Sequence, residues 1–190
     1  MGYCLIEAVI LSQVNKGRET PKSFSQILKE EVLNPLGMTQ TQVILEDDSA
    51  REGQDCRGHD RVGKTASSPF PVYPFAAAAG LWSTSEDLLT LVREIQHGLV
   101  GQSQLGIAKT LYEDMVSPQF ETPWAGLGLF LDQTEKGLEV SSMGWGIGFQ
   151  SMVIGYLRDQ TTLVVMTNSN LGVHQLKGFI GEVYRALFQS

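Results

Sequence analysis

The hydrophobic pattern of this chain of 190 residues changes its period at about residue 120. Before that point, apolar residues recur every three to four positions, which is the spacing of helices with one apolar face. Beyond it, they gather in short runs rich in Val, Leu, Ile and Thr, which favour strands. A last apolar pattern at helical spacing suits a helix that covers one face of a sheet. The order of helices, then strands, then one terminal helix predicts an α+β fold.

The first part of the chain contains clear helix signals. Leu5, Ile6 and Val9 belong to an apolar series that predicts an amphipathic helix over about 2–15. Two four-residue patterns resemble capping boxes that open further helices, Ser23-x-x-Gln26 and Ser83-x-x-Glu86. Gly98 is expected to close the second of them, and a shorter helix is expected over about 104–116.

The second part predicts an antiparallel sheet. Four short apolar segments are expected to form strands, namely 124–131, 138–143, 149–156 and 161–168. Arg158-Asp159-Gln160 is the expected turn of a hairpin between the last two. A closing amphipathic helix is expected between Val173 and Leu187.

Residues 46–74 are dense in charge and then in proline, which indicates a long surface loop with room for one short hairpin. Within it, Lys64-Thr65-Ala66 is superficially similar to a Lys-Thr-Gly motif, but it precedes a Ser/Pro-rich stretch, so an exposed loop lysine is the favoured interpretation. The glycines of 144–148 precede a strand rather than a helix, so they do not form a dinucleotide-binding loop.

Composition narrows the classes of partner. The formal net charge of −7 argues against a nucleic-acid-binding surface, which needs a basic face. No apolar run approaches the length of a membrane span. Cys4 and Cys56 form no metal-binding pattern, and the three histidines are widely separated, so we expect no metal and no cofactor.

Three segments, in this order, carry a resemblance to a known family. Residues 2–41 contain Gly-Tyr-x-Leu, two helices and Pro35-Leu36-Gly37-Met38-Thr39-Gln40-Thr41; residues 78–88 read Ala-Ala-Gly-Leu-Trp-Ser-Thr-Ser-Glu-Asp-Leu; and residues 144–151 read Gly-Trp-Gly-Ile-Gly-Phe-Gln-Ser before an apolar hairpin. Together they resemble the serine β-lactamase-related family, which includes class C β-lactamases, D,D-peptidases and related esterases.

The resemblance implies a penicillin-recognising fold of the β-lactamase/transpeptidase type. The whole of 1–190 is then the C-terminal part of one such domain, with 1–120 mainly helical and loop and 121–190 an antiparallel sheet with its terminal helix. It also implies a substrate among β-lactams, D-amino-acid peptides and esters, or a small ligand of that kind. The family is often periplasmic or secreted, and the chain itself assigns no compartment.

The chain departs from the family at its catalytic motifs. No Ser-x-x-Lys occurs in the sequence, and both this motif and Tyr-x-Asn are expected to lie ahead of Met1. The triplet aligned with the family's Lys-Thr-Gly or His-x-Gly is Ser142-Met143-Gly144, in which a neutral hydroxyl replaces a cation or imidazole. The resemblance gives the backbone N–H of Trp145 half of an oxyanion hole.

Two interpretations follow for function. In the first, this is the C-terminal fragment of a serine hydrolase and is inactive alone, because it carries no nucleophile. In the second, it is a non-catalytic relative, a pseudo-enzyme that binds a peptide or a protein through the old cleft. In either case, the strands that the family's N-terminal region supplies are expected to lie outside this sequence, which would leave 161–168 as an exposed sheet edge. We expect this edge to pair with a second copy as a dimer or strand swap, or the remaining strands to cover the gap.

Overall fold

The computed structural model describes residues 2–44, 55–66 and 71–188 of the chain. Its elements in chain order are α1 (Gly2–Val14), α2 (Phe24–Leu28), the π-helical turn η1 (Lys29–Leu33), β1 (Gln42–Val43), β2 (Leu81–Trp82), α3 (Ser85–Leu99), α4 (Lys109–Met115), β3 (Phe130–Thr134), β4 (Gly137–Gly146), β5 (Phe149–Tyr156), β6 (Thr161–Thr167), the 3₁₀ turn η3 (Gln175–Lys177) and α5 (Phe179–Phe188).

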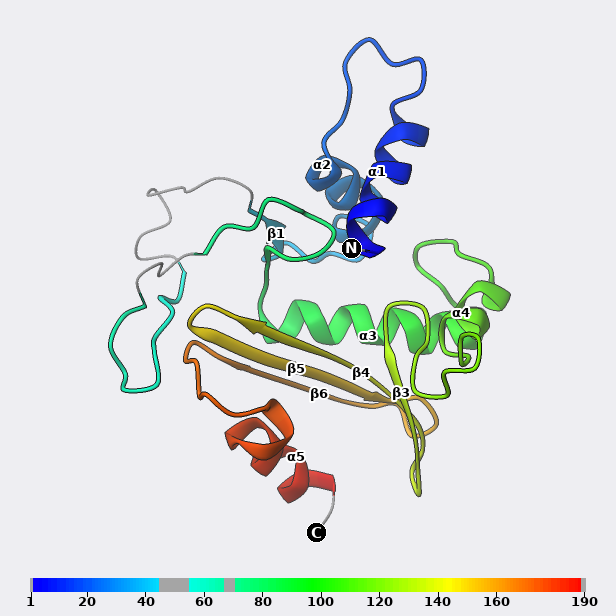
Figure 1. Cartoon of the computed structure of the whole chain (residues 1–190). Coiled ribbons are helices and arrows are strands. Elements are labelled where there is room, and N and C mark those ends of the chain that lie inside the picture. Colours follow the sequence, from blue (N-terminus) through cyan, green and yellow to red (C-terminus); the bar gives the residue numbers. More distant parts are fainter. Residues whose placement is uncertain (1, 45–54, 67–70, 189–190) are drawn as a thin grey trace.

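The main sheet is an antiparallel meander in the order β3-β4-β5-β6. Helix α3 runs along one face of this sheet and α5 lies against the other (Figure 1). Alternation along the strands divides the side chains between the two faces, so Gly155 of β5 meets Val92 of α3 while Ile154 packs with Ile180 of α5. This arrangement confirms the predicted α+β fold, and it places β6 at one edge of the sheet, as expected.

The sheet has a separate apolar core on each face. The core on the α3 and α4 side contains Ile95, Tyr112, Val116, Leu131 and Val140, and the core on the α5 side contains Met152, Ile154, Tyr156 and Ile180. A third cluster, Leu33, Leu36 and Met38, packs at the end of the N-terminal helices against Leu91 of α3.

The N-terminal helix was predicted in its extent but not in its packing. Helix α1 spans almost the predicted residues, yet none of its residues is buried, and Leu5 and Val9 are more than half exposed. The next helix behaves as predicted: Ser23 Oγ accepts from the Gln26 N–H, and the Gln26 side chain accepts from the Ser23 N–H. The capping box at Ser23 is confirmed.

The ends of α3 differ from the prediction. Its N-cap is Thr84, whose hydroxyl accepts from the Asp87 N–H, whereas the Ser83 hydroxyl is 2.7 Å from that of Thr41. Gly98 lies inside the helix, where an added Cβ would come within 2.3 Å of the Tyr112 ring, and Gly101, with φ +76°, follows the helix end. The prediction that Gly98 closes α3 is therefore wrong.

Other boundaries were also mispredicted, and α4 begins at Lys109 rather than near residue 104. The segment predicted as a strand over 124–131 is mostly turns, and β3 begins only at Phe130. The predicted closing helix is split into η3 and α5, with Gly178 between them. The hairpin turn at 158–160 is confirmed, with Gln160 at φ +52° between β5 and β6.

Candidate functional site

The candidate site lies along the second half of β4. Strand β3 pairs with β4 only from Gly137 to Ser141, while β5 pairs with β4 from Glu139 to Gly146. Among the described residues, the stretch 142–146 therefore has a neighbouring strand on one side only. Its other edge is the part of the sheet that a ligand can join.

The register decides which backbone groups face that free edge. The Leu157 N–H donates to the Leu138 carbonyl at 3.1 Å, which marks positions 138 and 157 as a hydrogen-bonded pair. In an antiparallel pair, hydrogen-bonded and non-hydrogen-bonded positions alternate. The backbone groups of Ser142 and Gly144 therefore face β5, whereas those of Met143 and Trp145 face the free edge.

The four residues singled out by the sequence all lie on this stretch. Ser142 is exposed on the face of the sheet that also carries Val140, the α3 face. Met143 packs beside the core under α5, and the Trp145 side chain is half exposed. At Gly144 an added Cβ would come within 2.5 Å of Ser151 Oγ on β5, so the Ser151 hydroxyl would have to rotate away to admit a side chain.

A segment far away in sequence packs on the end of this strand. An added Cβ on Gly148 would come within 2.7 Å of Gly58 Cα, so the two backbones touch at a pair of glycines. The His59 N–H also lies 2.9 Å from the Asn168 carbonyl, and the Asn170 N–H donates to the His59 carbonyl. The 55–66 segment is thereby fixed across the ends of β4, β5 and β6.

The 55–66 segment forms the short hairpin that the sequence allowed. His59 bridges to Thr65, and the Asp60 N–H donates to the Lys64 carbonyl at 2.8 Å. The remainder of the predicted loop at 46–54 and 67–70 lies outside the described residues. As predicted, Lys64 is exposed on this loop.

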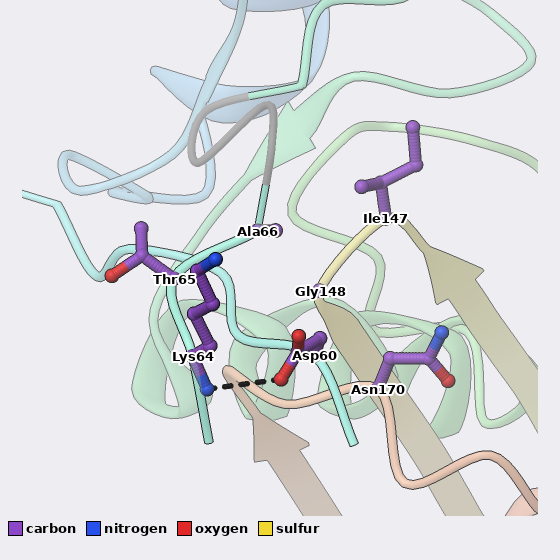
Figure 2. Close-up of a pocket in the computed structure, with 7 residues that line it drawn as sticks. All are labelled: Asp60, Lys64, Thr65, Ala66, Ile147, Gly148 and Asn170. Carbon is purple, nitrogen blue, oxygen red and sulfur yellow. Dashed lines mark hydrogen bonds between the residues drawn. The ribbon is translucent and has the colours of Figure 1, made fainter. Parts of the chain in front are cut away.

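The hairpin and the end of β4 line a cavity of about 380 Å³ that is open to solvent (Figure 2). Its walls are Asp60, Lys64, Thr65, Ala66, Ile147, Gly148 and Asn170. Next to it, Tyr73 covers Gly146, and the Ile147 N–H lies 3.3 Å from the Tyr73 hydroxyl oxygen. Sequence reasoning did not assign Tyr73, Asp60 or Asn170 to the site, since only the fold brings them to Gly148.

Within residues 2–44, 55–66 and 71–188, no group of three or more His, Cys, Asp and Glu side chains could hold a metal ion. The Nδ1 atom of His59 lies 3.0 Å from the Asn168 carbonyl oxygen, so this ring lies against the β6 end of the sheet.

Comparison with known proteins fixes the family. The Beta-lactamase family model matches residues 1–178, so the chain belongs to the beta-lactamase family. No curated protein matches the sequence. No helix in the described part of the chain combines the length and apolar character that crossing a membrane requires.

Solved structures share the fold at low identity. D-amino acid amidase from Ochrobactrum anthropi SV3 is 22% identical with a TM-score of 0.73, covering 100% of this chain and 56% of its own. A beta-lactamase/D-alanine carboxypeptidase from Pseudomonas syringae is 18% identical with a TM-score of 0.74, covering 97% and 57%. The octameric penicillin-binding protein homologue from Pyrococcus abyssi is 21% identical with a TM-score of 0.69, covering 96% and 44%. The chain thus spans about half the length of these structures.

Proposed function

We propose that this chain forms the third-motif side of a serine-hydrolase active site that acts on β-lactams, D-amino-acid peptides or esters. The observation that carries the proposal is the free edge of β4, where the Trp145 N–H faces outward beside the aligned triplet Ser142-Met143-Gly144. A substrate carbonyl placed at this edge accepts that N–H as one donor of an oxyanion hole.

The third-motif side of the active site cannot carry out hydrolysis by itself. One oxyanion donor contributes about 3 kcal/mol to a transition state, but only once a nucleophile has attacked the carbonyl. The sequence contains no Ser-x-x-Lys. Ser142 is neutral and holds a substrate carboxylate more weakly than a lysine would. We therefore expect the 190-residue chain to bind substrate-like ligands without turning them over.

Incubation with a fluorescent penicillin tests this expectation. The intact mass of the 190-residue chain should stay unchanged, while saturation with the unlabelled penicillin should shift the backbone amides of Met143 and Trp145 in an NMR spectrum. A covalent adduct on this chain would overturn the claim that it lacks a nucleophile. If the amide signals of Met143 and Trp145 do not shift at a saturating penicillin concentration, the proposed binding site is wrong.

The neutral residue at position 142 favours a second candidate, a non-catalytic module that binds a peptide or protein through the same cleft. The substitution Ser142→Lys separates the two. At a hydrolase-type site the restored cation should tighten binding of an acyl-D-Ala-D-Ala peptide, with its terminal carboxylate, several-fold over the carboxamide form. A non-catalytic module with a different ligand should show no preference for the carboxylate over the carboxamide peptide, either in the wild type or in Ser142→Lys.

The β6 edge of the sheet supports the proposal that the chain pairs with a second copy of itself. Strand β6 ends the order β3-β4-β5-β6, and its Met166 is 39% exposed. An edge of apolar residues pairs readily with another chain, so we propose a dimer or strand swap through 161–168.

Sedimentation velocity should therefore show a concentration-dependent dimer. Met166→Lys should shift it toward monomer, because a charge at an edge disfavours pairing. Leu176→Lys is the matched control, since Leu176 is 42% exposed and belongs to η3 rather than to β6. A wild-type protein that stays monomeric at every concentration contradicts the proposed dimer.

A further inference from the structure

The cavity at the end of β4 has walls of two different kinds. Its hairpin wall presents Asp60, Lys64 and Thr65, and its sheet wall presents Ile147, Gly148 and Asn170 (Figure 2). At about 380 Å³ it falls within the size range of small-ligand sites, which combine apolar surface with a few placed polar groups. It is large enough for one amino acid.

Asp60 is held in place by its own hairpin. Its Oδ1 accepts the backbone N–H groups of Val62 at 3.0 Å and Lys64 at 2.9 Å, which closes a tight turn. Among the described residues, no hydrogen bond or ion pair engages its second oxygen, Oδ2. The turn therefore fixes the carboxylate through one oxygen and leaves the other for a ligand.

Lys64 supplies the opposite charge. It is exposed, and within the described part of the chain its amine forms no ion pair, with Asp60 or with any other carboxylate. Across the cavity, Asn170 Oδ1 accepts the Gly172 N–H at 3.0 Å. That hydrogen bond orients the Asn170 amide and keeps the polar group at the sheet wall in place.

A cavity with one carboxylate and one amine that do not neutralise each other suits a ligand with both charges. We propose that it binds a free α-amino acid, whose carboxylate pairs with the Lys64 amine and whose ammonium pairs with Asp60 Oδ2. The amino acid side chain then lies against Ile147. Charge-assisted hydrogen bonds of this kind are stronger than neutral ones, and two of opposite sign select the zwitterion over either half alone.

This site is separate from the proposed hydrolase edge. Ile147 is the first turn residue after β4, two positions beyond Trp145, so the cavity begins where the strand ends. An amino acid in the cavity therefore lies beside the edge at 142–146 without occupying it. The inference stands on the cavity and does not require the proposed function.

Titration with D- and L-valine, followed by NMR, tests the proposal. At least one enantiomer should shift the amides of Thr65 and Gly148, with valinamide and N-acetylvaline each binding at least tenfold more weakly. Lys64→Met should weaken valine about tenfold and leave valinamide unchanged. Asp60→Asn keeps the Oδ1 acceptor, and with it the turn, and should weaken valine while leaving N-acetylvaline unchanged. Lys16→Met removes an equal charge after α1 and should change nothing.

Two results would overturn the amino-acid site. One is the absence of shifts at Thr65 and Gly148 with either enantiomer at millimolar concentration. The other is binding of valinamide and N-acetylvaline as tight as that of valine. Both readouts are independent of Met143 and Trp145, which report on the proposed hydrolase edge, so the two proposals fail separately.

Discussion

Replacement of Glu94 by alanine should lower the free energy of unfolding by about 3 kcal/mol, because it leaves several buried donors without an acceptor. Glu94 is 3% exposed on α3. Its carboxylate accepts from the Tyr112 hydroxyl at 2.5 Å, the Ser103 hydroxyl at 2.7 Å, and the N–H groups of Gln104 and Leu105. Urea unfolding followed by circular dichroism measures the loss.

Matched variants separate this network from a general effect of charge. Glu113→Ala removes an exposed carboxylate whose one ion pair among the described residues is with Lys109, so it should change stability by less than about 0.5 kcal/mol. Glu94→Gln keeps one acceptor oxygen and should fall between the two. A Glu94→Ala protein as stable as Glu113→Ala would show that the network does not hold the 103–105 segment to α3.

The same carboxylate makes stability depend on acid pH. Burial alone would raise the pKa of Glu94, but the hydrogen bonds from Tyr112, Ser103, Gln104 and Leu105 outweigh burial, and the pKa is lowered from its ordinary value of 4.5. A lowered pKa in the folded state stabilises the protein above the unfolded value. The contribution is therefore complete at neutral pH and is lost as the pH falls below about 4.5.

Replacement of Trp145 by proline should weaken an acyl-D-Ala-D-Ala ligand about tenfold, the upper range for one net hydrogen bond. Proline removes the N–H that faces the free edge, while the ladder to β5 keeps its hydrogen bonds through Ser142 and Gly144. Proline is tolerated where a strand edge is unpaired, so the fold should survive. Isothermal titration calorimetry measures the affinity.

Trp145→Ala is the control for this second prediction. It removes the half-exposed indole but keeps the backbone N–H, so its ligand affinity should stay within about threefold of the wild type. Equal losses in both variants would assign binding to the indole rather than to the backbone. That result would contradict the oxyanion role of Trp145.

Local signals in the sequence were sufficient where neighbouring residues decide the structure. The Ser23 capping box and the hairpin turn before Thr161 are set by residues within a few positions of each other. The N-cap of α3 was misplaced because two adjacent hydroxyl residues can both serve as the cap, and serine is the commoner choice. Ser83 is instead within hydrogen-bonding distance of Thr41, a contact 42 positions away that no local pattern encodes.

In the candidate site, too, the locally encoded part could be predicted and the part that depends on distant contacts could not. The expected strand over 138–143 and the glycines after it placed Ser142–Trp145 near a strand end, and the resemblance added their motif roles. The register then shows which of their backbone groups face away from β5. The cavity could not be predicted, because it depends on Gly58 meeting Gly148 and on His59 pairing beside Ser169. Only the folded chain brings Asp60, Lys64 and Asn170 together.

The most direct test of the free β4 edge is amide hydrogen exchange of the 190-residue protein, measured by NMR with and without an acyl-D-Ala-D-Ala peptide. In the free protein, the amides of Ser142 and Gly144 should be protected and those of Met143 and Trp145 should exchange rapidly. Saturating peptide should protect Trp145. Protection of Trp145 before any ligand is added, or no change after saturation, would contradict a substrate-binding edge at 142–146.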